Sequence, residues 1–159
     1  MQVSLDNAYE YCRGVTRRRA KNFYYAFIAL AHDQRKGIYA AYAFCRLSDD
    51  YSDENLPSKD KTRLLQEYRL QLAQAFDGKP DGPVFTALLD TSRRFDIPKE
   101  YFDEIIDGVE MDLTTDRYQT FDDLYRYCYK VASVVGLVCI QIFGYRDLRA
   151  RRYAVDMGI

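Results

Sequence analysis

The apolar residues of this chain recur with a helical period from one end to the other, and no stretch alternates apolar and polar residues as a half-buried strand does. Ser58 can cap one helix, and Pro83 and Pro98 suit the first turns of two others. Gly144 can end a long helix. The pattern predicts one all-α domain over residues 1–159, in which helices pack around a single core.

The helices expected from period, caps and breakers cover most of the chain. The expected ranges are Ser4 to Arg18, 22–30, Asp33 through Asp49, 58–76, 83–95, Pro98 through Met111, Thr120 to Gly144 and 146–159. The longest apolar stretch inside them, 131–143, is by itself too short to span a membrane.

Composition argues against several classes of function. Apolar residues make up 48% of the 159 residues and charged residues 30%, which is the balance of a soluble globular chain. Lys and Arg number 23 against 24 Asp and Glu, so the net charge of −1 gives no bulk case for binding nucleic acid. With His32 as the single histidine, a Ser-His-Asp triad or a multi-histidine metal site is not expected.

The four cysteines form no CxxC pair, so we do not expect a zinc knuckle. They lie in apolar helical stretches and are typical of small buried side chains in a reducing compartment. The N-terminus opens with polar residues and lacks the pattern of a signal peptide. We therefore expect a cytoplasmic protein. The 15 Tyr residues, with no Trp, indicate a core or cavity lined with hydroxyl groups.

The acidic end of the helix that begins at Asp33 carries the strongest chemical signal. Asp49 and Asp53 are four residues apart, so their carboxylates share one helix face. Arg46 and Tyr42 fall on that face one and two turns earlier. A hard cation such as Mg²⁺ binds carboxylates and substrate phosphates together, and an arginine offers a forked donor to phosphate. The alternative is a solvated acidic helix end, but the apolar residues before Arg46 favour a cavity in a bundle.

Four stretches in the same order resemble squalene and phytoene synthases. Tyr39–Glu54 resembles the first aspartate-rich motif of that family, and 21–27 resembles its N-terminal flap. Gly108–Leu113 is similar to its mid-chain glycine-acid motif, and Tyr127–Gly136 to its tyrosine-glycine helix. With Tyr9–Arg13 and the flap included, the resemblance is closest to bacterial presqualene diphosphate synthases of hopanoid and squalene pathways.

The resemblance implies an isoprenoid synthase-type helical bundle and a head-to-head prenyl transfer. Two farnesyl diphosphates would bind with Mg²⁺, or with Mn²⁺ in its place. One would ionise to an allylic cation, and the double bond of the other would attack it to give presqualene diphosphate. NADPH would be needed only for reduction to squalene, and the chain has no Gly-rich dinucleotide loop. An apolar pocket with tyrosine and phenylalanine faces suits a carbocation.

Matched motif by motif, the resemblance also implies roles for single residues. Asp49 and Asp53 would be metal ligands and take part in catalysis, while Tyr42 and Arg46 would contact the diphosphate. In the flap, a serine usually precedes the lysine, where this chain has Ala20, so a hydroxyl expected near the diphosphate is missing.

The remaining roles fall on the flap and on the two later motifs. Lys21 and Phe23 of the flap would bind substrate, as would Asp112, the mid-chain acid. Tyr127 and Tyr129 are candidates for the tyrosine that faces the cation or handles a proton, and Tyr129 is the favoured one.

Small residues follow those tyrosines on the same helix. Gly136, also assigned to substrate binding, should share a face with Tyr129 and Ala132. Small side chains there would leave room either for a long prenyl chain or for a closely packed helix, and the sequence leaves both open. Ser133 replaces a glycine that is common in the family, so we expect its hydroxymethyl group to narrow the cavity.

The family carries a second aspartate-rich motif shortly after the stretch that Asp156–Ile159 resembles. We expect this chain to be the N-terminal part only, to bind Mg-diphosphate weakly without turnover, and to self-associate through an exposed apolar patch.

Other interpretations stay open. Phytoene synthase would use geranylgeranyl diphosphate instead of farnesyl diphosphate. A head-to-tail elongase is disfavoured by the Phe-Cys-Arg that precedes the aspartates. A non-catalytic helical interaction fragment would show no metal-dependent diphosphate binding. Hydrophobic substrates of the farnesyl and squalene type also make association with a membrane surface plausible, but the sequence shows no strong basic amphipathic anchor.

Overall fold

Helices build the whole of the described chain. The computed structural model describes residues 3–53 and 57–159, and no strand occurs in those ranges, so the predicted all-α class is confirmed. The elements are α1 Leu5–Arg19, α2 Lys21–Ile28, α3 His32–Asp53, α4 Ser58–Phe76, α5 Gly82–Arg94, α6 Lys99–Thr114, α7 Phe121–Cys128, η1 Tyr129–Ser133, α8 Val134–Phe143 and α9 Arg149–Asp156.

Several predicted helix ends are confirmed by their caps. The Ser4 side chain accepts a hydrogen bond from the backbone N–H of Asn7. Thr120 accepts from the N–H of Asp123 at 3.1 Å and donates to its carboxylate at 2.6 Å. Gly144, at φ +77°, follows α8 directly. These polar caps satisfy backbone groups that have no partner inside the helix.

Several predicted starts differ from the structure. Helix α2 begins at Lys21, α3 begins at His32, and Ser58, expected as a cap, is the first residue of α4. Pro98 is the extended residue just before α6 rather than part of its first turn. The last helix begins at Arg149 and not at Arg146, because Asp147 accepts hydrogen bonds from the backbone and side chain of Arg149 and starts the helix there.

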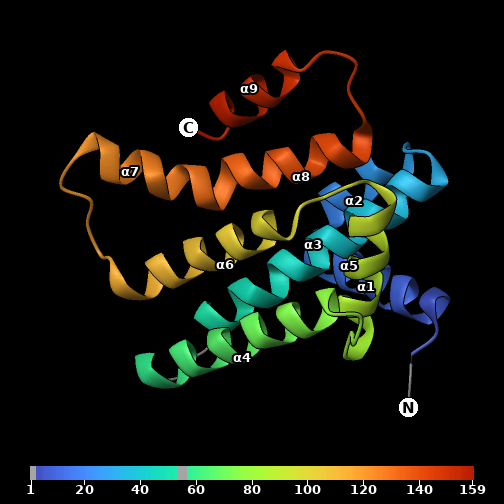
Figure 1. Cartoon of the computed structure of the whole chain (residues 1–159), viewed down its shortest axis with the longest axis horizontal. Coiled ribbons are helices and arrows are strands. Elements are labelled where there is room, and N and C mark those ends of the chain that lie inside the picture. The colour runs from blue at the N-terminus through green and yellow to red at the C-terminus, as the bar shows by residue number, and fades with distance from the viewer. Residues whose placement is uncertain (1–2, 54–56) are drawn as a thin grey trace. The chain divides into compact units, whose positions relative to one another are not determined.

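The long helix expected from Thr120 to Gly144 is interrupted by a π-helical turn, η1, which joins α7 to α8 (Figure 1). In this turn the N–H of Val134 bonds the carbonyl of Tyr129, five residues earlier. The combined run 121–143 is longer than the apolar stretch 131–143 considered alone. Among the described residues it is the one helix long and apolar enough to cross a membrane, by length and composition only, and core helices of soluble proteins meet the same criterion.

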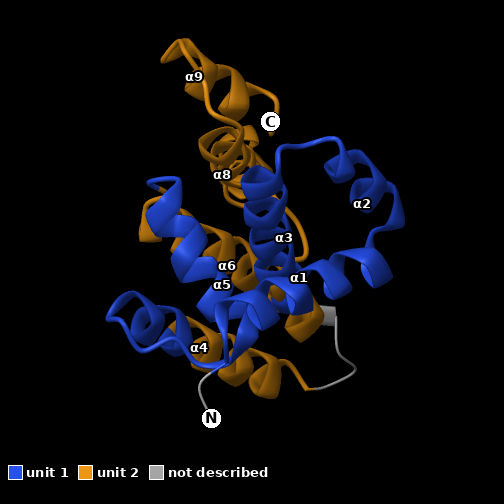
Figure 2. Ribbon diagram, turned by 90° about the vertical axis from the view of Figure 1, so that its right-hand side faces the viewer, with its two compact units in different colours: residues 1–47, 70–96 blue, residues 48–69, 97–159 orange. Residues whose placement is uncertain are grey.

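The chain forms two compact units, coloured separately in Figure 2. The first contains Met1–Leu47 and Leu70–Asp96, and the second Ser48–Arg69 and Ile97–Ile159. Helix α3 runs through both, with its acidic end in the second unit. The single domain expected over 1–159 stays a prediction.

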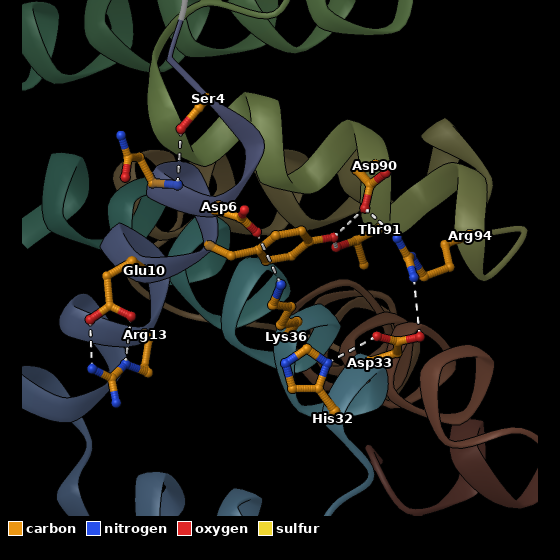
Figure 3. Close-up of polar contacts among 12 residues, drawn as sticks. Ser4, Asp6, Glu10, Arg13, His32, Asp33, Lys36, Asp90, Thr91 and Arg94 are labelled. Atoms are coloured by element: carbon orange, nitrogen blue, oxygen red, sulfur yellow. Dashed lines mark hydrogen bonds and ion pairs between the residues drawn. The ribbon is translucent and has the colours of Figure 1, made fainter.

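In the first unit, α1 packs against α5 and α2. The hydroxyl of Tyr9, which is 5% exposed, donates to Asp90 of α5 at 2.6 Å and lies 3.0 Å from the hydroxyl of Thr91. Figure 3 shows Arg94 between Asp90 and Asp33, with nitrogen–oxygen distances of 3.4 and 3.1 Å. These contacts join α1, α3 and α5.

In the second unit, α6 lies alongside η1 and α8, and α9 folds back over them (Figure 1). Apolar side chains of α6 and α8 are buried between these helices, among them Phe102, Ile106, Val134 and Ile142. This three-helix arrangement positions the candidate site, because it brings the mid-chain acid motif against the tyrosine helix.

Candidate functional site

Gly108 allows α6 to approach the π-helical turn closely. A Cβ atom at this position would lie 2.8 Å from Cγ1 of Val131 and 3.3 Å from the backbone carbonyl carbon of Lys130. Any side chain would therefore push the two elements apart. The glycine of the mid-chain motif is therefore explained by close packing of α6 against the turn. Asp112 lies one turn later on α6.

Asp112 and Tyr127 come together beside this contact. A hydrogen bond to Asp112, together with partial burial, raises the pKa of Tyr127 well above its usual value, because a carboxylate acceptor disfavours the phenolate. The ring of Tyr127 stacks on that of Tyr118, with centroids 5.0 Å apart. Residues from two motifs of the sequence resemblance therefore share one place in the second unit.

Tyr118 is a site residue that the sequence analysis did not identify. It lies in the loop between α6 and α7, its hydroxyl is buried without a hydrogen-bond partner among the described residues, and burial raises its pKa. It also lines a hollow of about 410 Å³ together with Met111, Arg117 and Arg126. The sequence offered one indication of Tyr118, namely its position between the mid-chain acid motif and the tyrosine helix.

A charged network ties the π-helical turn to α6. Lys130 donates to Glu104 and, at 2.9 Å, to Asp107. Asp107 also accepts from Arg69 of α4 at 2.6 Å. Burial alone would raise the pKa of Asp107, but the hydrogen bonds from Lys130 and Arg69 lower it. The network fixes the turn from which Tyr129 projects, and helical spacing in the sequence could not have revealed it.

Tyr129 is half-buried at the start of the π-helical turn. Burial raises its pKa, and the nearby negative charge of Glu104 adds to the effect. The predicted shared face with Ala132 and Gly136 assumed an unbroken α-helix. The π-helical turn changes the residue spacing between Tyr129 and Gly136, so α-helical spacing does not predict a common face for them.

Gly136 and Ser133, the two small residues that follow the tyrosines, both contact α9. A Cβ atom on Gly136 would lie 3.1 Å from the carbonyl oxygen of Ala154, so this glycine packs against a helix. Its role in substrate binding stays a prediction. The buried hydroxyl of Ser133 donates to the carbonyl of Val155 of α9 at 2.7 Å, and the expectation that Ser133 narrows a cavity stays a prediction.

The acidic end of α3 lies in the same unit as Asp112 and Tyr127. Asp49 is exposed there. Asp53 ends α3, and its side chain lies outside the described residues, as does Glu54 of the quoted motif. Tyr42 and Arg46, both half-buried, precede Asp49 on the helix and belong to the first unit.

No group of three or more His, Cys, Asp or Glu side chains suited to a metal occurs within residues 3–53 and 57–159, apart from the side chain of Asp53, which is not described. Mg²⁺ characteristically uses one or two protein carboxylates and completes its shell with water and substrate phosphates. An exposed Asp49 with a second aspartate one turn later fits that requirement, provided that a diphosphate supplies the other oxygens.

The flap residues lie on α2 in the first unit. Lys21 is exposed, and Phe23 is 59% exposed and stacks on Phe27 with centroids 6.0 Å apart. The half-buried ring of Tyr24 stacks on Tyr39 of α3, 5.7 Å between centroids. Their contacts with substrate stay predictions, like the other site assignments.

Of the four cysteines, which were all expected to be buried, Cys12 is buried, whereas Cys45, Cys128 and Cys139 are half-buried. All four have free thiols. Burial raises the pKa of Cys12 to about 12 and that of Cys139 to about 11, so both thiols are protonated and unreactive at neutral pH.

Comparison with known proteins assigns the family. Residues 16–159 match the family model described as squalene/phytoene synthase. The chain is 36% identical over 149 residues to a 15-cis-phytoene synthase from Synechococcus elongatus, covering 94% of this chain and 48% of that protein. It is also 36% identical over 157 residues to a phytoene synthase from Mycobacterium bovis, covering 99% and 51%.

Solved structures agree with this assignment. The squalene synthase HpnC from Alicyclobacillus acidocaldarius superimposes with a TM-score of 0.87 and 33% identity over 98% of this chain and 58% of that one. A dehydrosqualene synthase gives 0.82 and 30%, over 96% and 54%. The likeness confirms the isoprenoid synthase-type helical fold. The chain spans about half the length of the curated relatives it matches, and it belongs to the squalene/phytoene synthase family.

Proposed function

We propose that this chain forms the diphosphate-binding part of an enzyme that joins two prenyl diphosphates head to head. The observation that carries the proposal is the pairing of Asp112 with Tyr127 in the unit that also contains Asp49. Asp49, Asp112 and Tyr127 come from three motifs that lie far apart in the sequence, yet all three belong to the second compact unit. If the acidic end of α3 served only solubility, the pairing of Asp112 with Tyr127 in the same unit would have no functional explanation.

In the proposed reaction the C–O bond of one prenyl diphosphate breaks and leaves an allylic cation and free diphosphate. The double bond of the second prenyl group attacks the cation, and loss of a proton closes a cyclopropane ring. Negative charge develops on the leaving diphosphate, so donors placed there stabilise the transition state most.

Asp49 and Asp53 would hold Mg²⁺, with Mn²⁺ as an alternative. When bound, the cation supplies neutralisation of the diphosphate charge. Arg46, one turn before Asp50 on α3, adds a forked donor to phosphate oxygens, and Tyr42 adds a hydroxyl one turn earlier still.

Tyr127 and Tyr129 would face the cation. Their raised pKa values keep both phenols neutral at physiological pH, so each presents a ring face and a hydroxyl dipole rather than a phenolate. The ring faces stabilise positive charge, and the neutral hydroxyls do not trap it as strong nucleophiles. Asp112 would orient Tyr127 and would contact the substrate beside it.

Farnesyl diphosphate is the first candidate substrate, supported by the likeness to the squalene synthase HpnC. Geranylgeranyl diphosphate is the second, because two of the curated relatives at 36% identity are named phytoene synthases. Reduction of the product would require NADPH and is no part of the proposed condensation.

The proposal is tested by isothermal titration with farnesyl and geranylgeranyl thiodiphosphates, which react slowly, with and without Mg²⁺. We expect binding that requires Mg²⁺ and is lost in Asp49→Asn/Asp53→Asn. Asp77→Asn/Asp81→Asn is a matched control, since these exposed aspartates have the same spacing outside the helices. The tighter of the two analogues identifies the substrate. Equal binding by both double variants would contradict the assignment of the diphosphate to α3, and no binding at all would favour a non-catalytic helical fragment.

A further inference from the structure

Helix α2 is apolar in sequence yet has no buried residue. Six of its eight residues are Phe, Tyr, Ala or Ile. One side of the helix packs, because Tyr24 and Phe27 lie against Tyr39 of α3. On another side, Tyr25 is 71% exposed and Ile28, one turn later, is 45% exposed. An apolar helix with its aromatic side chains in water is unusual for a stable surface.

The segment around α2 is also the most basic part of the chain. Residues 11–32 contain five Arg or Lys and no acid, so the remaining residues carry a net charge of −6 in a chain whose total is −1. The positive charge is therefore concentrated on α1 and α2 and balanced elsewhere, which composition as a whole conceals.

The basic and aromatic side chains meet at one hollow between α1 and α2. The hollow has a volume of about 630 Å³ and is lined by Arg17, Arg18, Lys21 and Tyr25, among others. Its one acid, Glu10, is held by two hydrogen bonds from Arg13. Among the described residues, Arg17, Arg18 and Lys21 form no ion pair. The basic groups are thus free to meet negative charge from outside the chain.

We propose that this α1–α2 basic face, defined by Arg17, Arg18, Tyr25 and Ile28, docks onto the surface of an anionic lipid bilayer. The arginines meet lipid phosphates, and Tyr25 and Ile28 insert at the level of the headgroups, where aromatic side chains are favoured. Each basic group near such a surface strengthens binding severalfold. This inference goes beyond the proposed function and needs neither a prenyl substrate nor a metal.

The test is co-sedimentation of the full chain with phosphatidylcholine vesicles, with and without phosphatidylglycerol, in the absence of Mg²⁺ and prenyl diphosphate. We expect binding only to the anionic vesicles, weakened by added salt. Arg17→Glu/Arg18→Glu should weaken it at least about tenfold. Tyr25→Ser should weaken it severalfold, while its exposed counterpart Tyr153→Ser on α9 should leave it unchanged.

Lys79→Glu/Arg93→Glu is the matched charge control, because both residues are exposed in the same unit but lie outside the α1–α2 basic face. Unchanged far-ultraviolet circular dichroism verifies that each variant is folded. Equal binding to both kinds of vesicle, or equal weakening by the control, would overturn the proposal. Absence of vesicle binding together with binding to duplex DNA would overturn it in favour of a nucleic acid partner.

Discussion

At the scale of single residues, the buried hydroxyl of Tyr9 connects α1 to α5 in the first unit. Its hydroxyl donates to Asp90 and contacts Thr91. Tyr9→Phe removes this donor and leaves a partly buried carboxylate without it, so we expect a loss of about 1–3 kcal/mol of unfolding free energy in urea titrations. Tyr25→Phe, at a 71% exposed ring, is the control and should change stability little.

The same tyrosine makes stability depend on alkaline pH. Burial first, and then the hydrogen bond to Asp90, raise the pKa of Tyr9 in the folded protein. Above about pH 10 the unfolded chain releases the proton while the folded protein keeps it, so the unfolding free energy falls as pH rises. Tyr9→Phe should fall less steeply over that range. Parallel curves for the two proteins would show that Tyr9 does not titrate as described.

Gly108 lies where α6 contacts the π-helical turn, and a side chain at this position should destabilise the protein. A methyl group there would meet Val131 and the backbone of Lys130, neither of which can move freely. We expect Gly108→Ala to lower the unfolding free energy by about 1–3 kcal/mol. At Gly14 the same change meets only the flexible end of Arg18, at 3.3 Å. Gly14→Ala should be neutral or stabilising, because alanine favours helix. The reverse order of stability in urea would contradict this account of the α6–η1 contact.

At the scale of elements, α9 is held by a small set of contacts with η1 and α8. The hydroxyl of Ser133 donates to Val155, and Gly136 lets the backbone at Ala154 approach. Ser133→Ala removes the buried donor while keeping the Cβ atom. We expect faster hydrogen exchange at the amides of α9, with little change in α5, which lies in the other unit. Equal acceleration in both helices would indicate general destabilisation instead.

Helix positions were largely predictable because caps and breakers act locally. Thr120 precedes α7 and Gly144 follows α8 as expected, while Ser58, expected as a cap, is the first residue of α4. The π-helical turn was not predictable from local signals. It is tied to α6 by Lys130, whose partner Asp107 is 23 residues away, and by the absence of a side chain at Gly108. The π-helical turn therefore depends on contacts between α6 and η1.

At the scale of the whole molecule, the candidate site divides between what spacing predicts and what the fold adds. Helical spacing predicts that Asp49 and Asp53 share one helix face, and both residues belong to α3. The pairing of Asp112 with Tyr127 and the stacking of Tyr118 depend on how α6, η1 and the intervening loop meet. Sequence periodicity carries no information on such contacts, and the family resemblance supplied the roles without the geometry.

The length of the chain relative to its curated relatives predicts that the chain alone forms no product. Because the chain spans about half of its curated relatives, we expect the 159 residues alone to bind a prenyl diphosphate with Mg²⁺ but to form no product. Incubation with radiolabelled farnesyl diphosphate, followed by extraction and chromatography, measures this. Product formation at the rate of a full-length relative would show that these residues contain the whole catalytic apparatus.

The central claim is that the acidic end of α3 and the tyrosines of α7 and η1 serve one site. Mn²⁺ in place of Mg²⁺ broadens nuclear resonances near it, so we would record ring-carbon spectra of ¹³C-tyrosine-labelled protein with farnesyl thiodiphosphate and Mn²⁺. The account predicts selective broadening of Tyr127 and Tyr129, abolished in Asp49→Asn/Asp53→Asn. Sharp Tyr127 and Tyr129 signals with the metal bound, or broadening that survives in the double variant, would contradict it.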